Sequence, residues 1–216
     1  MSLTEKPILF NTDMVRAILE NRKTATRRVV KPQPTPDETK PHQVCKNIGD
    51  GTCFYFDCPG FDGVGPYKLR YRTGDVLYVR ETWLSYEQDH IIDGKKYAYK
   101  ADETSESDRI RKEYGYKWHP SIHMPKEAAR LFLRVTDVRV ERLQEITEEQ
   151  AESEGLYKGW TATERSSMAT TAKQAFMWVW DSTVKPADRA LYGWTANPWV
   201  WVIEFERISR EEVSHV

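Results

Sequence analysis

A short basic run, residues 21–28, places a lysine and a threonine three positions apart. If the helix predicted before it continues through the run, Lys23 and Thr26 lie on one helical face. The neighbouring cations lower the pKa of an amine among them, and a neutral lysine beside a hydroxyl can activate an oxygen nucleophile or move a proton. The alternative is a solvated basic helix end, where cations favour the negative pole of the helix dipole. The run taken alone favours this alternative.

Glu154 is a second candidate because of its place at the end of a predicted helix. Thr147 and Gln150 have the spacing of a capping box, and Gly155 is a typical helix stop. Glu154 therefore falls at the helix C-terminus, where the dipole disfavours a carboxylate. A residue that breaks a local rule without visible compensation indicates function.

The elements that must position these residues alternate between short strands and helices. Strands are predicted at residues 7–10, 76–82, 95–100, 131–140 and 199–205. Helices are predicted after a cap at Asn11 or Thr12, with Asn21 as the end, after Thr147, after Thr161 and, as a short piece, within 102–117. The apolar alternation slips near Thr136, which predicts a β-bulge or a strand break. Residues 185–198 are expected to form a loop.

The bulk properties limit the classes of function. A chain of 216 residues fits one domain with insertions, and its formal net charge of −1 gives no global basic field for nucleic acid. Any contact with nucleic acid must therefore come from a local cluster. Apolar runs stay short of the roughly 20 residues of a membrane span, and the N-terminus lacks a signal-peptide pattern. We therefore expect a cytoplasmic protein with no membrane partner.

Residues 31–71 are rich in proline and glycine turn signals, so a long irregular segment is predicted there. The segment holds four zinc-type side chains, which are His42, Cys45, Cys53 and Cys58. Four such side chains could form a tetrahedral zinc site, but their spacing lacks the paired C-x-x-C pattern. Reduced thiols are the favoured interpretation, and no cofactor is expected.

A loop that contains two prolines, Pro120 and Pro125, carries further polar and aromatic side chains. Trp118, His119 and His123 lie within it. A rigid loop with such residues favours the wall of a pocket.

Several short motifs occur in a specific order along the chain. They are Arg22-Lys23-Thr24-x-Thr26-Arg27, Gly74-Asp75-Val76-Leu77-x-Val79, a strand at 135–140, Thr147-Glu148-x-x-Ala151-x-x-Glu154, and Val202-Ile203-Glu204-Phe205. This order resembles the ASCH domain of the PUA-like superfamily, and most of all the longer ASCH-domain proteins of phages and prophages. The resemblance covers roughly residues 7–30, 72–83, 131–156 and 199–208.

The resemblance implies an α+β fold, a small PUA-like mixed β-barrel with flanking helices and long loop insertions. Residues 1–216 would form one domain, with insertions at about 31–71, 84–130 and 157–198. It also implies a cleft suited to RNA or a nucleoside. A small bacterial branch of the family hydrolyses 4-acetylcytidine with a lysine, a threonine and a glutamate. By motif match these are Lys23, Thr26 and Glu154.

The resulting expectation is an amidohydrolase in which Lys23 removes a proton from Thr26 or from water, and Glu154 orients the lysine. The expected substrate-binding residues are Arg22, Arg27, Arg28, Tyr78, Trp118 and His123. Three alternatives stay open. They are an RNA-binding module without catalysis, a ribonuclease that uses His119 and His123, and a phage accessory protein that binds another protein.

Overall fold

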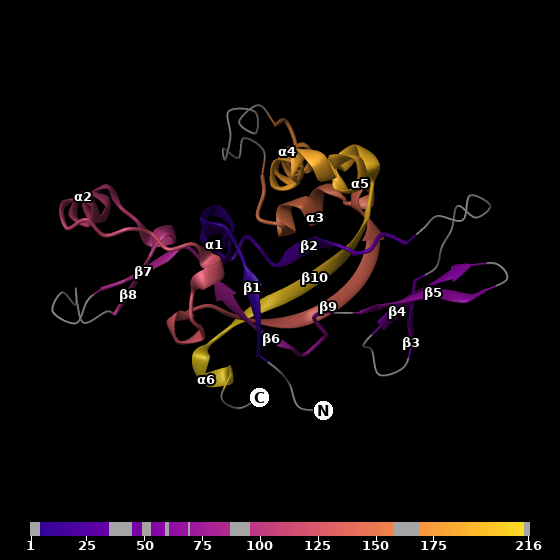
Figure 1. The fold of residues 1–216 in the computed structure, drawn as a ribbon, viewed down its shortest axis with the longest axis horizontal. Helices are drawn as coiled ribbons and strands as arrows, with labels where there is room; N and C mark the ends of the chain where they lie inside the picture. The colour runs from indigo at the N-terminus through magenta and orange to yellow at the C-terminus, as the bar shows by residue number, and fades with distance from the viewer. Residues whose placement is uncertain are drawn as a thin grey trace. The chain divides into compact units, whose positions relative to one another are not determined.

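The structure, a computed structural model, describes residues 5–34, 70–86, 96–157 and 169–213, together with the backbone of three strands between residues 45 and 68 (Figure 1). The chain divides into two compact units. The first consists of Met1–Asn21, Asp75–Arg134 and Glu206–Val216, and the second of Arg22–Gly74 and Val135–Phe205. Strands β9 (Phe132–Arg142) and β10 (Trp199–Ile208) each have residues in both units.

The first unit combines short strands with helices. Its elements are β1 (Glu5–Leu9), α1 (Thr12–Leu19), β6 (Val76–Arg80), β7 (Trp83–Ser85), β8 (Tyr97–Tyr99), η2 (Lys100–Asp102), α2 (Ser105–Glu113), η3 (Ser121–His123), η4 (Lys126–Ala128) and α6 (Arg210–Val213). β6 lies between β1, which is parallel to it, and β9, which is antiparallel, while β7 and β8 pair with each other. The predicted strands before residue 100, the helix capped by Asn11 and the short helix within 102–117 are confirmed.

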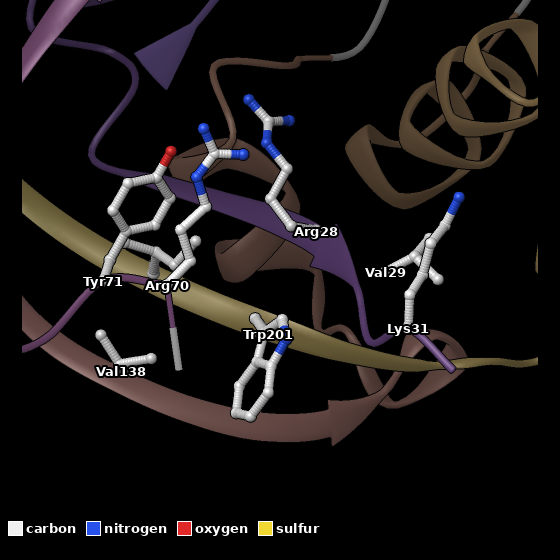
Figure 2. Close-up of a pocket in the computed structure, with 8 residues that line it drawn as sticks. Arg28, Val29, Lys31, Arg70, Tyr71, Val138 and Trp201 are labelled. Atoms are coloured by element: carbon white, nitrogen blue, oxygen red, sulfur yellow. The ribbon is translucent and has the colours of Figure 1, made fainter. Parts of the chain in front are cut away.

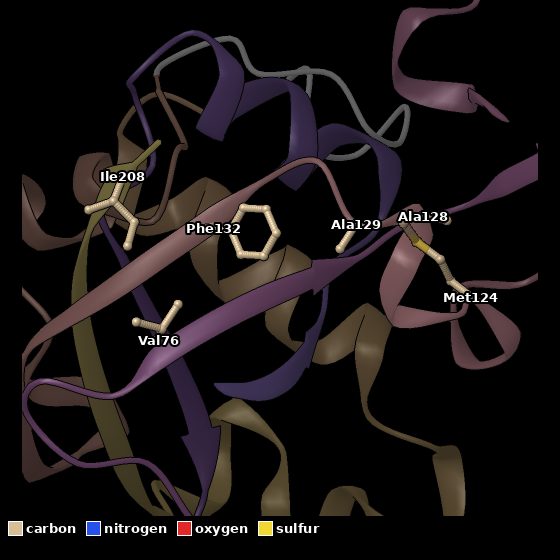
Figure 3. Packing of buried hydrophobic residues seen from close by; sticks show 6 residues of the cluster. All are labelled: Val76, Met124, Ala128, Ala129, Phe132 and Ile208. Carbon is tan, nitrogen blue, oxygen red and sulfur yellow. The ribbon is translucent and has the colours of Figure 1, made fainter. Parts of the chain in front are cut away.

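A buried apolar cluster ties the segment before β9 to the sheet of this unit. Val76 of β6 and Phe132 of β9 pack with Met124, Ala129 and Ile208, all at most 7% exposed (Figure 3). Burial of a Val, Phe, Met or Ile side chain stabilises a fold by roughly 1.5–3 kcal/mol. The loop that contains Pro120 and Pro125 is therefore anchored to this cluster through Met124.

The second unit places helices beside β2. Its elements are β2 (Ala25–Val29), β3 (Cys45–Ile48), β4 (Cys53–Cys58), β5 (Phe61–Lys68), η5 (Leu143–Glu145), α3 (Glu148–Ser153), α4 (Ala172–Thr183), η7 (Pro186–Asp188), α5 (Arg189–Tyr192) and η8 (Trp194–Ala196). β2 runs antiparallel to β10, with Thr26 opposite Ile203 and Arg28 opposite Trp201. α3 and α4 pack together (Figure 1). The five-stranded mixed sheet has the order β1-β6-β9-β10-β2, so the α+β class is confirmed.

The basic run is a strand and not the end of a helix. α1 ends at Leu19, and Asn21 then adopts the left-handed conformation with a φ of 57°. Asn tolerates this conformation better than most residues, which makes it a good terminator. Thr26 and Val29 are β-branched, and the strand formed by residues 25–29 pairs with β10, so these residues are extended. The helical face proposed for Lys23 and Thr26 does not exist.

Other sequence predictions also need correction. β9 is one continuous strand of 11 residues, so the strand break predicted near Thr136 is absent, while the alternative of a β-bulge stays a prediction. Residues 31–71 contain three paired strands, β3–β5, because apolar and aromatic runs such as 53–56 favour extended structure. The long helix begins at Ala172 with Thr171 as its N-cap, whereas the predicted cap at Thr161 lies outside the described residues. Residues 185–198, predicted as a loop, contain η7, α5 and η8.

None of the described helices is both long and apolar enough to cross a membrane.

Candidate functional site

Lys23 lies just before β2, in a single β-bridge with Glu154. Its ammonium group donates to Oε2 of Glu154 at 2.7 Å, to the carbonyl of Glu154 at 3.0 Å and to the carbonyl of Ala25 at 2.7 Å. Both charged residues are buried, with exposed fractions of 3% for Lys23 and 4% for Glu154. The three donors of the ammonium are thus matched by three protein acceptors.

Burial lowers the pKa of Lys23 below its ordinary value. The carboxylate of Glu154 opposes this shift by raising the pKa, and the positive charges of Arg28 and Arg27 lower it further. The sequence predicted this direction from the neighbouring cations. In the structure, burial is the largest cause.

Arg27 provides a second cation for Glu154. Its Nη1 lies 3.4 Å from Oε1 of Glu154, and its Nη2 donates to Glu141 at 3.1 Å and to Gln150 at 2.9 Å. The same Oε1 of Gln150 accepts from the backbone N–H of Thr147 at 3.0 Å, which completes the predicted capping box of α3. The carboxylate that opposes the helix dipole is therefore compensated by two buried cations.

Three consecutive residues cap the C-terminal end of α3. The backbone N–H of Thr24 donates to the carbonyl of Ser153 at 2.8 Å, and Lys23 donates to that of Glu154. Nη1 of Arg22 donates to the carbonyl of Gly155 at 2.7 Å. These are carbonyls that a helix end leaves without helical partners. The basic run thus caps the end of α3. The alternative of a solvated end of the first helix needs correction, because α1 ends at Leu19 and both Lys23 and Arg27 are buried.

Thr26 is buried, with an exposed fraction of 2%, and lies in β2 next to Arg27. Because side chains alternate along a strand, Thr26 and Arg28 face away from the side on which Arg27 meets α3. The structure brings Lys23 and Glu154 together. It directs Thr26 to the other face of β2.

A pocket of about 430 Å³ opens on that other face (Figure 2). Figure 2 shows Arg28 projecting from β2 and Trp201 from the neighbouring strand β10. The residues that line the pocket fall into three groups: the cations Arg28, Lys31 and Arg70, the aromatic residues Tyr71 and Trp201, and the apolar residues Val29, Val138 and Ile203. These described lining residues include three cations and no carboxylate, and we refer to the pocket by this lining as the electropositive pocket.

Tyr71 is the most buried polar group of this pocket, with an exposed fraction of 5%. Burial raises the pKa of its hydroxyl, while the charges of Arg70 and Arg28 lower it. The net direction is upward, so the hydroxyl keeps its proton near neutral pH and can donate a hydrogen bond. Arg70 lies over the Tyr71 ring, with its guanidinium carbon 5.4 Å from the ring centroid.

The remaining predicted binding residues belong to the first unit. Nε1 of Trp118 donates to Glu103 at 3.2 Å, Tyr78 lies under the ammonium of Lys126, and His123 is exposed. The ring of His119 packs against Trp83 with centroids 5.2 Å apart. Within the second unit, Arg22 and Arg27 lie beside Lys23 and Glu154 at the end of α3, and we call these four residues the Lys23 cluster. Arg28 lines the pocket.

Sequence reasoning missed Lys31, Arg70, Tyr71 and Trp201. The signal for Trp201 was present, since the alternation of Trp199 and Trp201 puts both on one face of a predicted strand. Arg70 and Tyr71 lay within a segment interpreted as irregular. Their place beside Arg28 depends on long-range structure, which local sequence signals do not give.

The described residues contain no group of three or more side chains arranged to hold a metal ion. His42 and the side chains of Cys45, Cys53 and Cys58 lie outside the described residues, so the zinc alternative stays a prediction.

No family model matches the chain, and comparisons with curated proteins and with solved structures give no significant match. The resemblance to the ASCH domain accordingly stays a prediction from the motifs.

Proposed function

We propose that this chain binds RNA, or a nucleotide of RNA, in the pocket that Arg28 lines. The observation that carries the proposal is the composition of that pocket, in which three cations and two aromatic rings surround about 430 Å³ without a carboxylate among the described lining residues. The resemblance to PUA-like domains, with their mixed β-barrel and RNA cleft, agrees with this proposal.

The cations suit a phosphate group. Arginine presents a planar fork of donors that fits two phosphate oxygens, and lysine adds a point charge. Arg28 is exposed, so its guanidinium can reach a ligand. Its backbone is held in β2 by pairing with Trp201 of β10.

The aromatic and apolar residues suit a base and its sugar. Single-stranded nucleic acids bind where a positive groove follows the backbone and aromatic rings stack on the bases. Trp201 is such a ring, and the hydroxyl of Tyr71 can donate to a base edge or a phosphate. Val138 and Ile203 provide apolar contact area beside them.

The Lys23 cluster supports this pocket from the opposite face of β2. Lys23 and Arg27 fix the strand to α3 through Glu154, so the outward side chains of the same strand begin from a rigid backbone. Rigid elements position binding side chains more closely than loops do.

The test is the affinity for a fluorescent single-stranded RNA of mixed sequence, measured by anisotropy. Arg28→Glu and Arg70→Glu should each weaken binding at least about tenfold, because each replaces a phosphate contact by a repulsive charge. Arg109→Glu is the matched control, since Arg109 is a largely exposed arginine on α2 of the first unit. Equal affinities in all four proteins would refute the proposal.

The amidohydrolase is a second candidate, favoured by the lowered pKa of Lys23 and its 2.7 Å contact with Glu154. A neutral Lys23 would take a proton from water, the water oxygen would bond to the acyl carbon of 4-acetylcytidine, and the C–N bond would break as the amine regains a proton. Lys23 is only 3% exposed, so this chemistry needs an opening of the cluster.

Release of cytidine from 4-acetylcytidine, followed by chromatography, tests this candidate. Lys23→Arg keeps the positive charge and removes the titratable amine. Release by the unchanged protein that Lys23→Arg abolishes would establish the candidate. A folded protein that releases no cytidine would exclude it.

A further inference from the structure

The first unit contains a second pocket, of about 470 Å³, between the β7–β8 hairpin and α2. Its floor is apolar. Leu84 and Ala98 are direct partners across the two strands, and Tyr86, two residues after Leu84, continues the same face.

Trp118 also lines this pocket and is held by polar contacts at its edge. Its Nε1 donates to Oε1 of Glu103 at 3.2 Å, and Nε of Arg111 donates to the same oxygen at 2.9 Å. The guanidinium of Arg111 lies over the indole, 5.4 Å from its centroid. Ser107, one helical turn before Arg111, lines the pocket from the same face of α2. These contacts fix the orientation of the indole.

The charges of this pocket are balanced by internal ion pairs. Arg111 pairs with Glu103 and Asp108, and Arg130 pairs with Asp102 and, through two hydrogen bonds of 2.9 and 3.1 Å, with buried Glu81. Each guanidinium is thus engaged by two carboxylates. An anionic ligand would have to displace these carboxylates, and a cationic ligand would meet arginines beside the rings that could attract it.

We propose that this pocket binds a neutral planar heteroaromatic molecule of the nucleobase class. Such a ligand needs ring faces for stacking, an apolar floor and a few polar groups at its edge. Tyr86 and Trp118 supply the rings. The described contacts of the Glu103 carboxylate use Oε1, and a carboxylate has about four acceptor positions, so capacity is left for an amino or N–H edge. The site is separate from the electropositive pocket, because the described residues that line the two pockets belong to different units.

The experiment measures binding of adenosine, guanosine, cytidine and uridine to the full chain by saturation-transfer NMR and calorimetry. We expect at least one nucleoside to bind. Trp118→Leu should weaken that binding by about 5- to 150-fold, the range for loss of one stacking ring. Ala98→Leu, which fills the floor without removing a polar contact, should weaken it as well and guards against a folding defect in the first variant.

One variant serves as a control, and a second distinguishes the two pockets. Tyr114→Leu removes an exposed aromatic residue of the same unit that is not among the described lining residues, and it should bind the nucleoside as the unchanged protein does. Arg70→Glu alters the pocket of the second unit, so a loss of nucleoside binding in this variant would assign the binding to that pocket. The proposal is overturned if no nucleoside binds, if binding survives Trp118→Leu and Ala98→Leu, or if Arg70→Glu abolishes it. Tighter binding of tetramethylammonium than of any nucleoside would overturn it too.

Discussion

Nζ of Lys23 lies 2.7 Å from Oε2 of Glu154, although the two residues are 131 positions apart in the chain. The contact joins the start of β2 to the end of α3, and the neighbouring residues Arg22 and Thr24 bond the carbonyls on either side. The pair is therefore part of a helix cap, with Arg27 as its second cation.

Removal of one member of this pair should destabilise the fold strongly. Lys23→Met leaves the buried Glu154 with Arg27 alone and removes the donor to two carbonyls, so we expect a loss of about 3–5 kcal/mol in the free energy of unfolding. Urea denaturation measures it. Glu152→Gln, an exposed carboxylate on the same helix, should change it by less than about 0.5 kcal/mol.

The double variant Lys23→Met/Glu154→Leu separates the buried charge from the packing. It should recover part of the loss, because no uncompensated carboxylate remains beside the apolar side chain. If it is less stable than the sum of both single variants predicts, the buried-charge explanation is wrong.

The Lys23 amine should titrate at lower pH in the folded chain than in the unfolded chain, because burial lowers its pKa from 10.5. Between these two pKa values the unfolded chain binds more protons, so the stabilisation linked to this group is complete above pH 10.5 and is lost as the pH falls through the lowered pKa. The ¹³Cε signal of Lys23, assigned by its absence in Lys23→Arg, follows the titration with and without urea. Coincident curves would contradict the prediction.

RNA affinity should fall as the salt concentration rises. The slope of this dependence should reflect how many pocket cations contact phosphates. For single strands the slope of log affinity against log salt is about −0.7 per phosphate contact. Arg70→Gln should therefore make the slope less negative by about 0.7, with Arg109→Gln as the unchanged control. An unchanged slope in Arg70→Gln would place the phosphate elsewhere.

Gly155 should resist substitution. Its φ of 90° follows directly on the end of α3, and its carbonyl accepts from Arg22. A side chain in a left-handed conformation costs about 1–2 kcal/mol, so Gly155→Ala should lower the unfolding free energy by that amount in urea denaturation. A loss as small as that of Glu152→Gln would show that the turn relaxes.

Local signals predicted much of this fold. The Asn11 cap, the capping box of Thr147 and Gln150, and the apolar run that predicts β10 depend on neighbours within a few residues, and each is confirmed. The long-range partners were less accessible. The sequence indicated that Glu154 was anomalous, but the compensation comes from Lys23 and Arg27, which only the pairing of distant elements places beside it.

The lack of long-range information also explains how the site residues were grouped. Lys23, Thr26 and Glu154 were grouped by a motif, and a helical spacing would have put Lys23 and Thr26 on one face. The pairing of residues 25–29 with β10 instead imposes a period of two and directs Thr26 away from Arg27. The pocket residues Arg70 and Tyr71 follow a segment whose turn signals concealed its strands, so nothing local linked them to Arg28.

The alternation of β2 also limits how this stretch can change in evolution. The adjacent arginines have different roles, since Arg27 is buried against α3 and Arg28 lines the pocket. Insertion or deletion of one residue here would exchange the two sides, burying one guanidinium without its carboxylate and exposing the other. Substitutions at single positions can be tolerated, but changes in length within this strand should be rare among homologues. In an alignment shifted by one residue, the structural Arg27 would be mistaken for the arginine that binds the ligand.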